Sequence, residues 1–167
     1  MKALIVVDMQ KDFIDGSLGS KEAQAIVLNV KNKIEEYKKN NNRVIFTRDT
    51  HKENYLETNE GRYLPVKHCI YGTPGWEIPG ILDDAKCRHI DKPNFGWLFW
   101  KEFDFEEIEL VGLCTDICVV SNALILKAMF PEANITVDAS CCAGVTPESH
   151  KAALLTMKMC QINVIGE

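Results

Sequence analysis

The sequence lacks long apolar runs and an excess of basic residues. No apolar segment approaches the roughly 20 residues that a membrane-spanning helix needs, which predicts that no membrane is a partner. Residues 1–8 are too short, and reach a charge too early, for a secretory signal, so we expect a cytoplasmic location. Lysine and arginine together number 19 against 24 acidic residues, and the net charge of −5 argues against nucleic acid as a partner.

Cysteine is plentiful, but its pattern does not suit a disulfide framework. There are seven cysteines, an odd number, and we expect free thiols because no secretory signal is recognised. Cys141 and Cys142 are adjacent, which is a poor geometry for a mutual disulfide. We expect Cys69, Cys87 and Cys160 to be small apolar residues of the core.

Strand and helix signals alternate along the chain, which has neither repeats nor linkers. Hydrophobic residues make up 46% of the 167 positions, enough for one full core, so we expect a single domain over residues 1–167. Apolar periodicity predicts helices over residues 20–39, after Thr115, and from Thr146 onward. Short branched runs predict strands at 2–7, 43–48, 87–90, 107–113, 134–137 and 161–165. This alternation predicts an α/β fold of three layers, with helices on both faces of a six-stranded parallel sheet.

Polar side chains follow most of these strands. In a parallel sheet the carboxyl ends of the strands lie along one edge, where ligands bind. We therefore expect one group of residues to meet there: Asp8, Asp49, His51, Lys92, Cys118 and Asp138.

Cys118 is the candidate nucleophile of this group. It lies on the predicted first turn of the helix that follows the strand 107–113, with Thr115 as the helix cap, and the free N–H groups of such a turn favour a thiolate. Asp8 could take the thiol proton, and Lys92 could keep Asp8 ionised and lower the thiol pKa. Taken alone, each residue is better interpreted as structural, Asp8 as a cap or loop residue and Lys92 as a solvated surface residue, and only the three together favour a catalytic set.

Asp49, His51 and His68 are candidate metal ligands. Alternation along an extended segment points Asp49 and His51 the same way, and two imidazoles with one carboxylate leave positions open for a substrate or water. Glu57 and Glu60 are candidates for an outer-shell role. The alternative, in which both histidines only hydrogen-bond loop backbone, is equally consistent with the spacing.

Three further groups carry weaker signals. Cys114 and Cys118 are four residues apart, so a redox pair is conceivable, although dithiol oxidoreductases use a tighter spacing. Asp138 and His150 are interpreted as structural residues of a turn and a helix surface. The dense aromatic segment 95–105 is expected in the core or in an interface of a homo-oligomer.

Taken together, these motifs resemble the isochorismatase-like cysteine hydrolases, within them the nicotinamidase/pyrazinamidase branch. Five stretches in family order carry the resemblance and span nearly the whole chain: residues 7–13, 49–51 with 65–75, 92–96, 112–119 and 138–150. The resemblance implies the sheet order 3-2-1-4-5-6 and a catalytic set of Cys118, Asp8 and Lys92. It also implies a cis peptide bond between Leu113 and Cys114, with the N–H groups of Cys114 and Cys118 as an oxyanion hole.

The family resemblance further implies an activity. Such an enzyme cleaves the carboxamide of a small, nicotinamide-like molecule to an acid and ammonia through a thioester. A divalent metal, zinc or else manganese or iron, would sit on Asp49, His51 and His68, and Phe13, Leu64 and Tyr63 would line the substrate pocket. Leu64 replaces the aromatic residue that often precedes the histidine segment in the family, which makes the substrate ring the open point. A related hydrolase of another amide or carbamoyl compound is the first alternative, and a non-catalytic ligand or redox sensor is the second.

Overall fold

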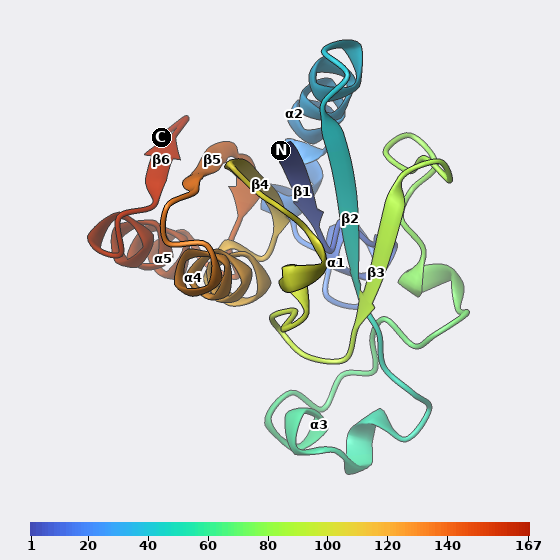
Figure 1. The fold of residues 1–167 in the computed structure, drawn as a ribbon. Helices are drawn as coiled ribbons and strands as arrows, with labels where there is room; N and C mark the ends of the chain where they lie inside the picture. Colours follow the sequence, from blue (N-terminus) through green and yellow to red (C-terminus); the bar gives the residue numbers. More distant parts are fainter.

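The computed structural model describes residues 1–167 as a six-stranded, all-parallel sheet with helices on both faces (Figure 1). The strand order is β3-β2-β1-β4-β5-β6, which confirms the expected architecture. The strands are β1 (Lys2–Val7), β2 (Arg43–Asp49), β3 (Arg88–Lys92), β4 (Glu107–Leu113), β5 (Asn134–Ala143) and β6 (Asn163–Ile165). Because β1 is central, the residue that follows it lies in the middle of the carboxyl edge.

The sheet divides the core into two apolar clusters, one under the helices of each face. The helices are α1 (Lys11–Ile14), α2 (Lys21–Lys39), α3 (Asn59–Tyr63), α4 (Val120–Met129) and α5 (Pro147–Met159). On one face α1 and α2 pack with Leu4 and Val6 of β1, and on the other α4 and α5 pack with Ala3, Ile5 and Val7. The short helix α3 stands apart from both layers, in the segment after β2 (Figure 1). None of the helices combines the length and the apolar character that crossing a membrane requires.

The helices expected from residues 20 and 146 are confirmed, and both have capped N-termini. Ser20 caps α2 by accepting a hydrogen bond from the N–H of Ala23, and Thr146 and Ser149 form a reciprocal capping box at α5. The cap predicted at Thr115 is wrong. A π-helical turn (Thr115–Val119) precedes α4 there, and the Thr115 hydroxyl contacts His150 Nδ1 at 2.8 Å instead of capping.

Three strands extend beyond their predicted ends. β2 runs one residue further than expected, to Asp49. β3 runs on to Lys92, so this lysine is the last residue of a strand instead of a loop residue. β5 was expected to end at Val137 but continues to Ala143, with an irregularity where Leu110 pairs with Val137 and Gly112 pairs with Cys142. The prediction that Asp138 ends a strand at the site is therefore wrong, because the strand continues for five residues beyond it.

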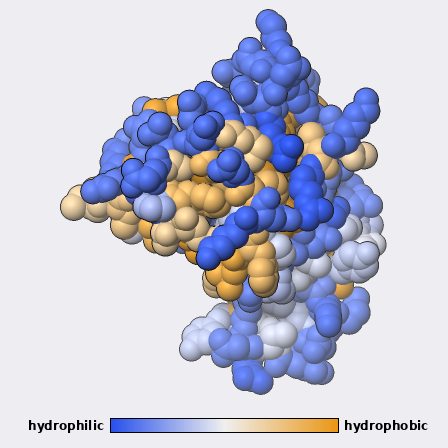
Figure 2. Space-filling model, in the orientation of Figure 1, coloured by the Kyte–Doolittle hydropathy of each residue, from blue (hydrophilic) through white to orange (hydrophobic).

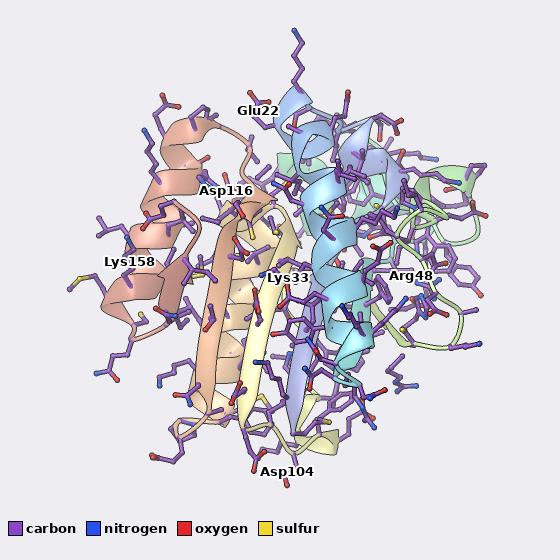
Figure 3. All side chains as sticks on the ribbon, turned by 90° about the horizontal axis from the view of Figure 1, so that it is seen from above. Glu22, Lys33, Arg48, Asp104, Asp116 and Lys158 are labelled. Carbon is purple, nitrogen blue, oxygen red and sulfur yellow. The ribbon has the colours of Figure 1, made fainter.

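Asp138 instead belongs to a buried ionic network between α2 and the sheet. Lys33 Nζ of α2 lies 2.8 Å from Glu109 Oε1 and 3.0 Å from Asp138 Oδ2, and the Tyr37 hydroxyl donates to Glu109 Oε2 at 2.6 Å. Figure 3 shows Lys33 between α2 and the strands, well below the edge where Asp116 lies. Asp138 is thus structural, which agrees with its interpretation from the sequence as a structural residue.

The cysteines outside the site and the residues of the aromatic segment differ in how deeply they are buried. All seven cysteines are free, as expected. Cys69 is buried and Cys87 is half-buried. The expectation of a core position for Cys160 is wrong, because this residue is exposed after α5. Trp100 and Phe105 pack in the core, whereas Phe95, Leu98 and Phe99 are exposed. Figure 2 shows apolar side chains gathered over α4 and the segment between β3 and β4. A homo-oligomer remains a prediction.

Candidate active site

Asp8 follows β1 at the centre of the carboxyl edge and is fully buried. Its backbone takes a φ of +47°, a left-handed conformation that aspartate tolerates better than most residues. This turn aims the side chain at β2, where the Thr47 hydroxyl donates to Asp8 Oδ1 at 2.6 Å. Burial raises the pKa of Asp8, and the Lys92 ammonium opposes this effect. A carboxylate with a raised pKa is a better proton acceptor near neutral pH.

Lys92 contacts the nucleophile, its base and one residue of the expected metal site. Its Nζ lies 2.6 Å from Asp8 Oδ2 and 3.8 Å from Asp49 Oδ1, and it donates to the Cys118 Sγ at 3.5 Å. The side chain is fully buried, so the ammonium depends on these partners for its charge. Burial lowers the pKa of Lys92, but the neighbouring Asp8 and Cys118 raise it more, and the net direction is upward.

Cys118 lies in the π-helical turn after β4 and is buried. The expected α-helical first turn is wrong in detail, since α4 begins two residues later at Val120. The peptide bond between Leu113 and Cys114 is cis, as the family resemblance implied. Gly112 comes before it with a φ of +121°, and a Cβ there would lie 2.1 Å from the Val7 carbonyl oxygen.

The thiol is not held as a thiolate by its surroundings. Burial raises the pKa of Cys118 well above its ordinary value, and the lowering effect of Lys92 does not offset this. The expectation of a depressed thiol pKa is therefore wrong. A helix N-terminus and one ammonium do not compensate for removing a thiolate from water beside two carboxylates. Cys118 consequently needs a base that takes its proton as it reacts.

Asp49, His51 and His68 meet as expected, and Glu60 of α3 joins them. The ligand atoms of the four residues all lie within 4.8 Å of one another. His51 Nε2 is 2.9 Å from Asp49 Oδ2 and 3.5 Å from Glu60 Oε1, while His68 Nε2 is 3.5 Å from the same Asp49 oxygen. Glu60 is therefore in direct contact with the histidines, whereas Glu57 is exposed and lies outside the cluster.

This cluster fits a divalent metal ion. The Val66 carbonyl oxygen lies 2.8 Å from His68 Nδ1, so Nδ1 carries the hydrogen and Nε2 presents a lone pair to the cluster. Burial raises the pKa of Asp49, but its interactions with the two histidines and with the Lys92 ammonium lower it more, and the carboxylate stays ionised. Asp49 Oδ1 is buried without a hydrogen-bond partner. Two imidazoles and two carboxylates form a donor set typical of zinc and of other first-row divalent ions.

Two buried amide side chains position these groups, and sequence reasoning missed both. The Gln10 side chain accepts from the Asp49 N–H at 2.7 Å and donates to the Asp49 and Trp76 carbonyl oxygens, each at 2.8 Å. Asn122 of α4 donates to the Cys118 carbonyl oxygen at 2.8 Å and accepts from the Trp97 N–H at 2.9 Å. The only signal in the sequence for Gln10 was its place two residues after Asp8, the aspartate that follows β1.

A cavity of about 530 Å³ opens between the thiol and the cluster. Its wall contains Cys118, Cys114 and the cluster residues Asp49, Glu60 and His68. Phe13, Leu64 and Phe95 supply apolar surface beside them. Tyr63, expected at this pocket, instead lines a separate hollow beyond Glu60 and is 86% exposed. The α3 turn directs Leu64, and not Tyr63, towards the cavity.

Comparison with known sequences shows the family to which the chain belongs. Residues 2–166 match the isochorismatase domain. The chain belongs to the isochorismatase family. It is 30% identical to an uncharacterised isochorismatase family protein of Bacillus subtilis, with 92% of each chain covered. It is also 25% identical to the nicotinamidase/pyrazinamidase of Mycobacterium tuberculosis, with 99% of this chain and 98% of that one covered.

Solved structures of pyrazinamidases and nicotinamidases have the same fold as this chain. A zinc complex of the pyrazinamidase of Pyrococcus horikoshii superimposes with a TM-score of 0.85 at 27% identity, covering 99% of both chains. The nicotinamidase/pyrazinamidase of Streptococcus mutans gives 0.85 at 28% identity, with 99% of this chain and 100% of that chain covered. This isochorismatase-family chain is therefore an amidohydrolase, and its four-residue cluster offers a set of ligands that fits a divalent metal.

Proposed function

We propose that this protein hydrolyses the carboxamide of a nicotinamide-like molecule to the acid and ammonia through a thioester on Cys118. One observation carries the proposal. A single buried ammonium, Lys92, bridges the Cys118 thiol and the Asp8 carboxylate beside a cavity that the His51–His68 cluster also borders. The names of the relatives from M. tuberculosis and P. horikoshii support a pyridine or pyrazine carboxamide as the substrate class.

Acylation begins with the thiol. Cys118 Sγ bonds to the amide carbon while its proton passes to Asp8, and the carbonyl π electrons move onto the oxygen. We assign this proton to Asp8 Oδ2, because Oδ1 accepts a hydrogen bond from Thr47 whereas Oδ2 lies beside Lys92, which also contacts the thiol. Collapse of this intermediate breaks the C–N bond, Asp8 returns the proton to the leaving nitrogen, and ammonia departs.

Deacylation repeats the proton transfer with water. Asp8 takes a proton from water as its oxygen attacks the thioester carbon, and the Cys118–carbon bond breaks. Asp8 returns this proton to the Cys118 thiolate. The carboxylic acid product leaves the site and gives up its own proton to the released ammonia in solution. Lys92 stays protonated throughout, and its charge stabilises whichever of Asp8 and Cys118 is negative. In both halves of the cycle we assign the N–H groups of Cys114 and Cys118 to the developing oxyanion.

We assign the cluster of Asp49, His51, Glu60 and His68 to zinc, with manganese and iron as the alternatives. When bound, the ion supplies a Lewis acid that can hold a ring nitrogen of the substrate. The chain's own apolar residues Phe13, Leu64 and Phe95 then orient the ring and exclude water from it.

The test is an ammonia-release assay with the metal content measured on the same sample. Nicotinamide and pyrazinamide are compared with an aliphatic amide and an N-carbamoyl amino acid, which represent the alternative hydrolase. We expect release from the two aromatic amides, complete loss in Cys118→Ala and unchanged activity in the matched control Cys160→Ala, since Cys160 is exposed after α5. Full activity of Cys118→Ala would refute the nucleophile, and turnover of only the carbamoyl compound would refute the substrate class.

A further inference from the structure

We propose that the cavity contains a second compartment, an apolar extension, that binds an apolar substituent on the ring of the substrate. Its lining includes Leu18 and Ala23, from the segment that leads into α2 and from its first turn, and Ile117 and Val145, from the turn after β4 and the loop after β5. It lies where the start of α2 approaches the loop after β5, the edge at which Figure 3 shows both Glu22 and Asp116. The inference rests on the proposed function and narrows its substrate class.

The volume of the cavity exceeds what an unsubstituted ring needs. An apolar cavity of roughly 150 Å³ holds benzene, and scaling from six to nine heavy atoms gives roughly 225 Å³ for a pyridine carboxamide. The cavity measures about 530 Å³. More than half of it is thus left over, which is room for several further carbon atoms.

The chemistry of the walls selects what can fill this space. The only carboxylates that line the cavity, Asp49 and Glu60, belong to the metal cluster. The Ser20 hydroxyl is engaged in capping α2. Burial raises the pKa of Cys114 to about 12, so this thiol is neutral at physiological pH. Outside the metal cluster no charged side chain lines the cavity to pair with a charged substituent. A hydrocarbon group would replace water along an apolar wall.

Both walls are fixed by hydrogen bonds, so the extension is a preformed site and not a gap between mobile loops. Asp116 accepts from the Val145 N–H at 3.0 and 3.2 Å, and the Ser149 hydroxyl donates to the same carboxylate. Opposite, the Leu18 N–H donates to the Asp12 carbonyl oxygen at 2.9 Å. A preformed apolar wall binds without the cost of ordering a loop.

The experiment compares nicotinamide with its 4-, 5- and 6-propyl derivatives and with a carboxyethyl analogue of equal size. Ammonia release gives kcat/KM, and calorimetric titration of Cys118→Ala gives affinity without turnover. We expect at least one propyl isomer to bind about tenfold more tightly than nicotinamide, because a buried propyl group leaves water. The carboxyethyl analogue is expected to gain nothing. Equal or weaker binding of all three propyl isomers would overturn the extension.

Two variants localise the effect. Val145→Phe places a ring in the extension, and we expect the propyl-to-nicotinamide affinity ratio to fall to one or below. Leu155→Phe, an equally exposed apolar position on α5 outside the cavity, should leave the ratio unchanged. A retained ratio in Val145→Phe would also refute the assignment, with thermal melting as the check on folding. If no amide yields ammonia from the wild-type protein, the amidase function fails, while the affinity ratio still decides on the extension.

Discussion

Replacing Lys92 with methionine tests the electrostatic basis of the site. Methionine is close to lysine in length, so it preserves packing while removing the charge that faces Asp8 at 2.6 Å. Both side chains are fully buried, and removing one partner of a buried ion pair costs about 3–5 kcal/mol because the other charge is left uncompensated. The nearby Asp49 carboxylate, 3.8 Å from the same ammonium, adds to this penalty.

The assay is urea unfolding followed by circular dichroism, at one metal concentration for all variants. We expect Lys92→Met to lower the free energy of unfolding by about 4 kcal/mol at pH 7 and to abolish ammonia release. Without Lys92, burial holds the pKa of Asp8 still further above its unfolded value. The folded state then binds a proton more tightly than the unfolded state, so the penalty shrinks as pH falls through the raised pKa.

A double-mutant cycle completes the test. Asp8→Asn in the Lys92→Met background removes the stranded carboxylate, and we expect it to recover most of the lost stability, though no activity. A Lys92→Met protein within about 1 kcal/mol of the wild type, less than the pair predicts, would refute the reasoning. A double variant that is no more stable than Lys92→Met alone would also refute it.

Three other predictions address the surroundings of the site. His68→Ala should lower zinc affinity at least tenfold in a competition titration, while Lys67→Ala, an exposed neighbour, should not change it. Gln10→Ala leaves the buried Asp49 N–H without its acceptor, so we expect a loss of about 2 kcal/mol in urea unfolding together with weaker zinc binding. Burial raises the pKa of Asp138, but the Ser140 hydroxyl and Lys33 lower it more. The stability that Asp138 provides is therefore complete above its unfolded pKa of about 4 and disappears as pH falls through the lower folded value. The stability difference between wild type and Asp138→Asn, about 2 kcal/mol at pH 7, should narrow below pH 4.

The sequence was sufficient to predict the sheet and the meeting of Asp8, Lys92 and Cys118. All three follow or end parallel strands, and the βα alternation that brings strand ends to one edge is visible in apolar periodicity. Asp138 was placed wrongly at that edge because the break in the apolar run after Val137 coincides with an irregularity inside β5, and not with its end.

Other features depend on contacts between distant segments. Glu60 reaches the histidines through the single turn of α3, within a stretch whose sequence has no periodicity to fix its direction. The same turn decides that Leu64 and not Tyr63 borders the cavity. The thiol pKa depends on how completely the fold buries Cys118, which local sequence does not specify.

The central position of β1 has a consequence for how activity appears during folding. Asp8 follows β1, Lys92 ends β3, and Cys118 follows β4. The chain must therefore pair β1 with β4 on one side and, through β2, join it to β3 on the other. A partly folded chain that has paired only β1 and β2 holds none of the contacts around Lys92. In a refolding experiment, ammonia release should therefore return later than helical circular dichroism, since long-range strand pairing is slow compared with helix formation. The active site thus reports the pairing of β1 to β4, the four strands that carry or connect its residues.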